Sequence, residues 1–173
     1  MSTKLPNRKA LRLKCFDYNN ESAYFITICT KDRRCLLSQI VGTGVLTCPS
    51  VELTPHGKIA DRIIHQMDDF YDHISVDGYV IMPNHIHMLV RIIKKPQKTT
   101  SGQVGTPVPT NRNSALSLFV SGFKRYCTRE YGESVWQTRY FDHIIRNQKD
   151  YDAHLRYIDE NPLRWQLDEL YTP

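Results

Sequence analysis

The chain has 173 residues, 40% of them hydrophobic and 24% charged, a composition typical of one soluble globular domain and too short for two comfortable ones. No apolar run approaches the roughly 18 residues of a membrane span, and no hydrophobic segment of a secretory signal follows the basic N-terminus, so we expect a cytoplasmic protein without membrane association. The formal net charge of +5 is compatible with a polyanionic partner, and five cysteines without a CxxC spacing argue against a disulfide framework or a cysteine zinc site.

The N-terminal half predicts a strand, a helix and a hairpin. Residues 22–30 are rich in β-branched and aromatic side chains and predict a first strand. An irregular, glycine-containing stretch follows. Residues 54–70 then predict a helix with Thr54 as its N-cap and apolar residues at helical spacing. The apolar runs 73–82 and 85–93, separated by a two-residue turn, predict an antiparallel hairpin.

The C-terminal half predicts two further helices around a short strand. Residues 94–112 contain almost no large apolar side chain, so we expect a flexible connector. Residues 114–131 carry an amphipathic helical pattern that ends at a glycine. A short edge strand is predicted within 135–145. Asn147 then caps a last helix, which Pro162 ends.

The predicted order of elements is strand, helix, two strands, helix, strand, helix. This order indicates an α+β sandwich of ferredoxin-like type, with an antiparallel sheet and helices covering one face. We expect one domain over residues 1–173, with residues 1–15 as a flexible tail.

The strongest chemical pattern is the histidine pair His85 and His87. Alternate residues of a strand point to the same face, so both imidazoles can converge on one metal ion. A random pair of this kind would more often face solvent. Here the surrounding YVIM and MLVRI indicate a strand that is apolar on both faces and therefore central, where unpaired imidazoles would be costly to bury.

The last helix offers a phenol and an amide on one face. Tyr157 and Asn161 are four residues apart, while Tyr151, Leu155 and Ile158 form the packing stripe. The helix can thus present both polar groups to the sheet. An isolated tyrosine among ten would more often be structural, so this feature gains weight from the histidine pair.

At these residues the chain resembles a known family. The segment YVIMPNHIHMLV resembles the HUH signature (histidine, hydrophobe, histidine) of the single-tyrosine transposases, specifically the REP-associated tyrosine transposases. The segments YFITICTKDRRCLL, SLFVSGFKRYCTREY and VWQTRYFDHIIRNQKDYDAHLRYIDENPLRW resemble further parts of that family in the same order. The similarity spans residues 15–165.

The resemblance implies a catalytic role for Tyr157, which would attack a phosphorus of single-stranded or hairpin DNA and leave a 5′-phosphotyrosine link with a free 3′ hydroxyl. It implies Mg²⁺ or Mn²⁺ held by His85 and His87. Asn161 is our candidate for the third ligand, with Glu160 as an alternative. His154, one turn before Tyr157, is a candidate proton acceptor.

DNA contacts are expected from basic side chains on phosphates and aromatic side chains on unpaired bases. The candidates are Lys124, Arg125, Arg129, Arg139, Tyr140, Arg146, Arg164 and Trp165, together with Arg33, Arg34 and Trp136.

Three other functions stay open: a domesticated protein that binds a DNA or RNA hairpin without cutting it, a metal-dependent nuclease that uses water, and a plain structural module. The oligomeric state, monomer or homodimer, is open as well.

Overall fold

The computed structural model describes residues 21–42, 49–93 and 114–172. The elements in chain order are β1 (Ser22–Cys29), a 3₁₀ turn η1 (Lys31–Arg33), β2 (Ser38–Val41), β3 (Ser50–Leu53), α1 (Pro55–Phe70), β4 (Ile74–Ile81), β5 (His85–Ile92), α2 (Ala115–Tyr131), β6 (Phe141–Ile144), α3 (Gln148–Glu160) and a second 3₁₀ turn η2 (Asn161–Leu167). The predicted tail 1–15 and connector 94–112 lie outside the described residues.

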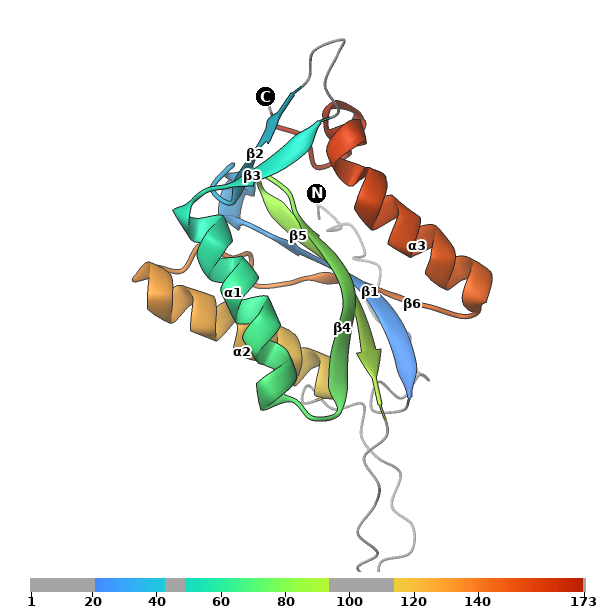
Figure 1. The fold of residues 1–173 in the computed structure, drawn as a ribbon. Helices are drawn as coiled ribbons and strands as arrows, with labels where there is room; N and C mark the ends of the chain where they lie inside the picture. Colours follow the sequence, from blue (N-terminus) through green and yellow to red (C-terminus); the bar gives the residue numbers. More distant parts are fainter. Residues whose placement is uncertain (1–20, 43–48, 94–113, 173) are drawn as a thin grey trace, which may run out of the picture.

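Four antiparallel strands form the main sheet in the order β4-β5-β1-β6. With α1 between β1 and β4 and α2 between β5 and β6, this is the ferredoxin-like order, and the predicted α+β class is confirmed (Figure 1). β5, which carries both histidines, lies inside the sheet between β4 and β1. Thr27 pairs with His87 and Cys29 with His85.

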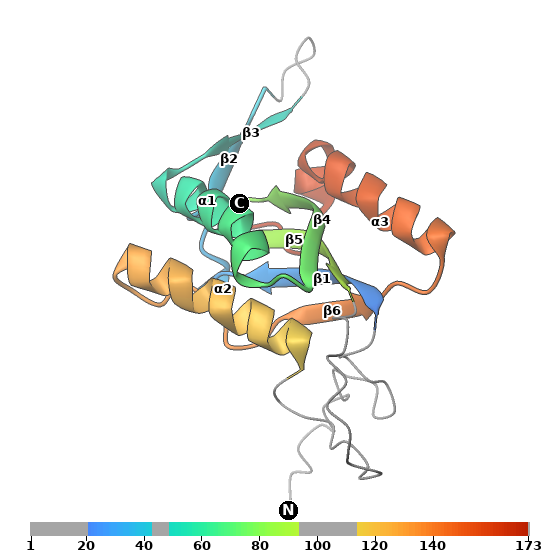
Figure 2. The same cartoon turned by 60° about the horizontal axis from the view of Figure 1, so that its bottom comes forward.

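The two faces of the sheet are covered differently. α1 and α2 pack on one face, whereas α3 lies across the other (Figures 1 and 2). The prediction placed helices on one face only, so α3 adds a further layer. Tyr24, Ile26 and Ile28 of β1 belong to a buried core shared with α1 and α2. The alternate residues of β1 and β5 consequently face α3.

Side-chain caps start both helices of this layer, and the cap that was predicted, Thr54, forms as expected. Thr54 accepts a hydrogen bond from the amide of Gly57 at the start of α1, and Ser114 accepts one from the amide of Ser117 at the start of α2. Gly132 ends α2 at φ 74°, a left-handed conformation that favours glycine.

Two parts of the chain differ from the expectation. The stretch described as irregular contains the hairpin of β2 and β3, which is separate from the main sheet. Its strands have four residues each, too few to show a clear period of two. The helix α3 ends at Glu160, before Pro162, as predicted. The turn η2 that follows was not predicted, and it forms because proline is tolerated at the start of a helical turn.

None of the helices in the described part of the chain combines the length with the hydropathy that a membrane span requires.

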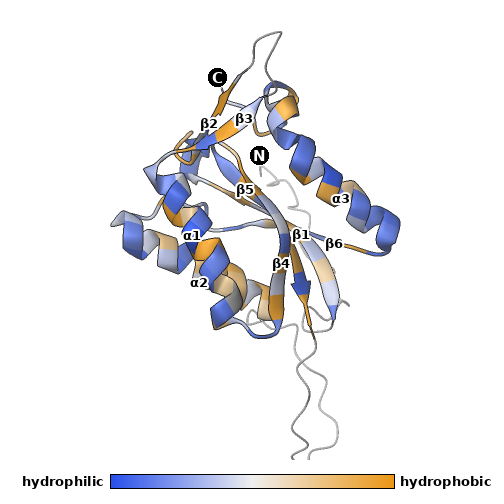
Figure 3. Cartoon of the chain, viewed as in Figure 1, coloured by the Kyte–Doolittle hydropathy of each residue, from blue (hydrophilic) through white to orange (hydrophobic). Residues whose placement is uncertain are grey.

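A polar contact ties α3 to the sheet. The buried carboxylate of Asp77 in β4 accepts hydrogen bonds from Arg91 (2.7 and 2.9 Å), from the Tyr151 hydroxyl (2.9 Å) and from Ser75 (3.0 Å). Beside it, Gly78 leaves room for α3: a Cβ there would lie 2.9 Å from Cδ1 of Leu155. Most of α3 is hydrophilic (Figure 3), so these few contacts position the helix.

We expect Asp77→Asn to lower the free energy of unfolding by about 1–3 kcal/mol at pH 7, because the charged partner of Arg91 and Tyr151 is lost. Burial raises the pKa of Asp77, but the hydrogen bonds from Arg91, Tyr151 and Ser75 lower it by more. The pKa is therefore below its ordinary value. A lowered pKa stabilises the fold above the unfolded value of about 3.9, and this stability is lost as the pH falls through the folded value. The difference from wild type should therefore shrink in acid.

Urea unfolding at several pH values measures this effect. The control is Asp72→Asn, whose carboxylate is largely exposed, and we expect a change within about 0.5 kcal/mol. Equal stabilities of the Asp77 variant and wild type at pH 7 would contradict the assigned role.

Candidate functional site

Both histidines of β5 are buried and oriented by hydrogen bonds at Nδ1. Nδ1 of His87 lies 2.8 Å from Oγ1 of Thr27 in the neighbouring strand, and Nδ1 of His85 lies 2.8 Å from Oδ1 of Asn84 in the turn. The ring centroids of the two histidines are 4.4 Å apart. Within the described residues, neither Nε2 atom has a hydrogen-bond partner.

Tyr157 of α3 lies over this pair. Its ring centroid is 5.2 Å from that of His87 and 5.7 Å from that of Phe25. Its side chain stays partly open to solvent, with 37% of the residue exposed. Helix α3 thus brings a phenol beside the imidazoles and leaves it accessible.

The turn after α3 contributes a carboxylate that was not among the predicted site residues. Asp168 follows η2, and its Oδ2 accepts hydrogen bonds from the Tyr157 hydroxyl at 3.2 Å and from Nδ2 of Asn161 at 3.3 Å. Trp165 of the same turn is buried, with its ring centroid 5.9 Å from that of His85. Ligand atoms of His85, His87 and Asp168 all lie within 4.8 Å of one another.

Asn161, the predicted third ligand, lies next to this group. It is buried, and its Oδ1 has no hydrogen-bond partner in the described part of the chain. The alternative, Glu160, instead forms an ion pair of 2.6 Å with Arg164 at the surface. Two oxygens, one from Asp168 and one from Asn161, are therefore candidates beside the histidines.

Burial controls the charge of the site. It lowers the pKa of His85 to about 3, with help from Arg33, and the pKa of His87 to about 3, with help from His85. Both imidazoles are therefore neutral at pH 7 and have lone pairs available. Burial, followed by the charge of Asp168, raises the pKa of Tyr157 to about 12, so the free phenol is protonated.

These residues fit a divalent cation. Two buried Nε2 atoms without partners, oriented by hydrogen bonds at Nδ1, are what a histidine metal site requires. Imidazole nitrogens with a carboxylate or amide oxygen suit Mn²⁺ and related ions.

A cavity of about 930 Å³ opens beside the group. Its lining includes His87, Tyr157 and Asp168, the cationic side chains of Arg33 and Arg164, and the exposed ring of Phe141 in β6. A cavity of this size can hold a ligand as large as a nucleotide unit. The position of Phe141 was missed because β6 is too short for its facing to be predicted.

The predicted DNA-binding residues do not form one surface. Arg164 lines the cavity, whereas Trp165 is buried beside His85. Arg125 and Arg129 instead lie on α2, flanking the ring of Tyr126 at 5.6 and 5.5 Å. The sheet separates α2 from α3 (Figure 2), so these two groups of basic residues cannot contact the same short strand segment.

Other members of the predicted set have structural contacts. Nζ of Lys124 donates hydrogen bonds to the backbone oxygens of Gln137 (2.7 Å) and Arg139 (3.0 Å), and burial lowers its pKa to about 8. The ring of Tyr140 lies 5.8 Å from the same Nζ. Among the remaining candidates, Arg34, Arg139 and Arg146 are exposed, whereas Trp136 is buried.

No protein-family model matches the chain. An uncharacterized protein of Haemophilus influenzae is 32% identical over 194 aligned positions, which cover 99% of each chain. A REP-associated tyrosine transposase of Escherichia coli is 26% identical over 91 residues, 52% of this chain and 45% of that protein.

A solved structure of a REP-associated tyrosine transposase bound to a REP hairpin is 21% identical, with a TM-score of 0.56 over 83% of this chain and 67% of that one. The structural likeness establishes a shared fold. Together with the similarity in sequence, it confirms the predicted resemblance to the REP-associated tyrosine transposases.

We expect Asp168→Asn to weaken Mn²⁺ binding by about tenfold or more, since a charged oxygen next to both imidazoles is lost. Asn161→Ala tests the second oxygen in the same way. Calorimetric titration of metal-free protein measures both. Glu169→Gln removes the same charge from an exposed neighbour and should leave the affinity unchanged. Equal losses in the Asp168 and Glu169 variants would mean that only the local charge matters.

Proposed function

We propose that this chain, which resembles the REP-associated tyrosine transposases, cleaves and rejoins single-stranded or hairpin DNA through a covalent 5′-phosphotyrosine intermediate. One observation supports the proposal most directly. The Tyr157 hydroxyl donates a hydrogen bond to the carboxylate of Asp168, and that carboxylate lies within 4.8 Å of ligand atoms of both buried imidazoles. A partly open phenol beside an unsatisfied set of metal ligands has no evident structural purpose.

In this proposal His85, His87 and an oxygen of Asp168 or Asn161 hold the cation. When bound, the ion supplies Lewis-acid polarisation of a phosphate oxygen. Thr27 and Asn84 keep the two imidazoles oriented through their Nδ1 atoms. A neutral imidazole that is held in this way needs little reorganisation before it binds an ion.

Tyr157 is the proposed nucleophile. Its oxygen forms a bond to the scissile phosphorus, which stays attached to the 5′ oxygen of the downstream strand. The bond from phosphorus to the 3′ oxygen of the upstream strand breaks, and that 3′ oxygen takes up a proton and leaves as a hydroxyl. The phenolic proton must first be removed. Oδ2 of Asp168 accepts a hydrogen bond from the Tyr157 hydroxyl at 3.2 Å, so this oxygen is the proposed proton acceptor. Nδ1 of His154, our earlier candidate, lies instead 2.8 Å from the backbone oxygen of Asp150.

The substrate contacts follow from the cavity. Arg33 and Arg164 can neutralise backbone phosphates, and the exposed ring of Phe141 offers a platform for an unpaired base. Hairpin DNA is proposed because the solved structural relative is bound to a REP hairpin. Tyr157 and His87 of one chain are in contact, so a monomer can carry the complete site.

Tyr157→Phe should abolish the covalent adduct and lower the cleavage rate by about 10³-fold or more, because the attacking oxygen is removed. The assay incubates end-labelled single-stranded hairpin DNA with protein and Mn²⁺ or Mg²⁺ and detects the protein-linked strand on a denaturing gel. Tyr151→Phe, on the same helix but bonded to Asp77, is the matched control and should retain the adduct.

The outcomes separate the alternatives. Cleavage by wild type without an adduct, or cleavage that survives Tyr157→Phe, would indicate a hydrolytic nuclease that uses water. Binding without cleavage at any metal concentration would indicate a domesticated hairpin-binding protein.

Arg164→Ala should weaken binding of single-stranded DNA and lower the salt dependence of the affinity by about one phosphate contact. Arg129→Ala removes the same charge from α2, on the other side of the sheet, and should change neither quantity. Fluorescence anisotropy at several salt concentrations compares them. A larger effect for the Arg129 variant would move the DNA path to the α2 face.

A further inference from the structure

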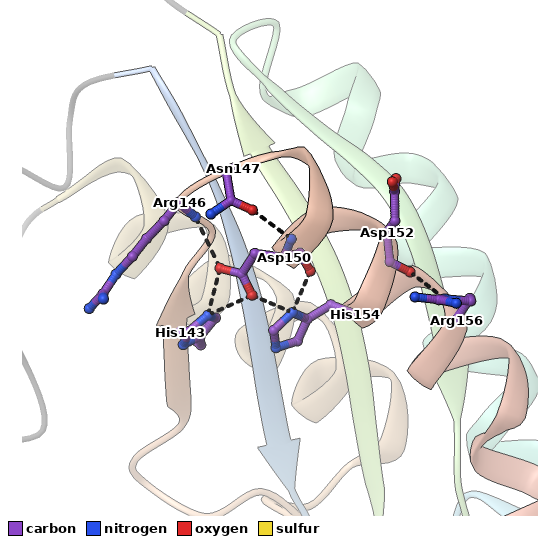
Figure 4. A network of polar contacts seen from close by, with 7 residues as sticks. All are labelled: His143, Arg146, Asn147, Asp150, Asp152, His154 and Arg156. Atoms are coloured by element: carbon purple, nitrogen blue, oxygen red, sulfur yellow. Dashed lines mark hydrogen bonds and ion pairs between the residues drawn. The ribbon is translucent and has the colours of Figure 1, made fainter.

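A second group of potential metal ligands lies where α3 meets the edge of the sheet. Ligand atoms of His143, Asp150 and His154 are all within 4.8 Å of one another. Figure 4 shows the two imidazoles turned toward the carboxylate from different elements, His143 from β6 and His154 from α3. The group shares no candidate metal ligand with the site around His85, although His154 also lines the cavity of that site, and the proposed cleavage reaction does not use it.

The fold fixes the carboxylate firmly. Oδ1 of Asn147 caps α3 by accepting from the amide of Asp150 at 2.9 Å, and Oδ2 of Asp150 accepts in return from the amide of Arg146 at 3.0 Å. This reciprocal capping leaves little freedom to the Asp150 side chain. Its carboxyl stays ionised, because the amide of Arg146 and then His143 lower its pKa.

The two histidines are positioned just as closely. His143 pairs with Phe25 in the sheet and therefore faces α3, while His154 lies one helical turn after Asp150 on the same helix face. Their rings stack with centroids 4.7 Å apart and an angle of 22° between the planes. All three side chains remain partly exposed, so an ion can enter from solvent.

The distances suit a small divalent ion. Nε2 of His143 lies 3.2 and 3.0 Å from the two carboxylate oxygens of Asp150, and Nδ1 of His154 lies 3.1 Å from Oδ1. Bonds of about 2.0–2.1 Å in a tetrahedral site place neighbouring ligand atoms about 3.3 Å apart. Only a small spreading of the three side chains is needed to admit an ion.

We propose that His143, Asp150 and His154 form a second metal site, which binds a borderline transition ion of the zinc class and clamps the first turns of α3 to β6. Two imidazole nitrogens, one carboxylate and water are a typical zinc ligand set. The ion takes the place of the proton between the carboxylate and the His143 ring, and it also replaces the proton on Nδ1 of His154, which lies 2.8 Å from the backbone oxygen and 3.1 Å from Oδ1 of Asp150. Each neutral ring then carries its proton on the other nitrogen. This site does not depend on the proposed cleavage of DNA.

Metal titration of the full chain after removal of metal by a chelator tests the proposal. Co²⁺ is followed by its visible absorption and Zn²⁺ by competition with a chromophoric chelator. We expect His85→Ala/His87→Ala to retain one equivalent of bound ion, and addition of His143→Gln to weaken that binding by about 100-fold or more. Zn²⁺ should raise the melting temperature of the first variant and leave that of the second unchanged.

His65→Gln is the matched control. His65 lies four residues after Asp61 on α1 and contacts its backbone oxygen at 2.9 Å, as His154 does with Asp150, but the Asp61 carboxylate is bonded to Tyr79, and no metal-ligand group of the described chain includes either residue. This variant should bind as wild type does.

Two results would overturn the proposal: no stoichiometric binding by His85→Ala/His87→Ala, or binding that His143→Gln leaves intact. If the double variant does not fold, wild type and His143→Gln are compared directly, and an unchanged number of bound ions has the same meaning.

Discussion

The alternation of side chains along β5 is the constraint on which the rest of the molecule depends. Ile86, Met88 and Val90 face α1 and α2 and are fully buried in the apolar core, so His85 and His87 must face the opposite side. A shift of the pairing with β1 by one residue would turn both imidazoles into that core. The packing that stabilises the fold therefore also fixes the direction of the proposed metal ligands.

Helix α3 must satisfy two opposing demands on that second face. It has to cover buried polar groups, and it has to leave the phenol of Tyr157 accessible. The helix approaches the sheet closely at Gly78 and is tied there by the bond from Tyr151 to Asp77. At its other end the turn η2 carries Trp165 under His85 and returns Asp168 to Tyr157. The cavity is bordered by α3, by this turn and by residues of β1 and β6 such as Phe25 and Phe141.

Sequence periodicity predicted most of the fold. The caps Thr54 and Asn147 and the histidine pair are local features, and each was found where local chemistry indicated. The hairpin of β2 and β3 was not predicted because four-residue strands carry too little pattern. Asp168 was not predicted as part of the site because its contact with Tyr157 depends on a turn beyond the presumed helix end. The predicted DNA-binding residues did not form one surface, because the positions of charges in the sequence do not reveal that the sheet separates α2 from α3.

The order of the site residues along the chain has a consequence for synthesis. The imidazoles are made halfway through translation, after the strand that pairs with them, whereas Tyr157 and Asp168 come near the end. A chain interrupted by a premature stop after α2 holds both histidines and much of the apolar core, yet it lacks the proposed nucleophile and the carboxylate beside it. Under the proposed function, such incomplete products would lack the nucleophile and both candidate oxygen ligands of the ion, so they could not break a DNA strand.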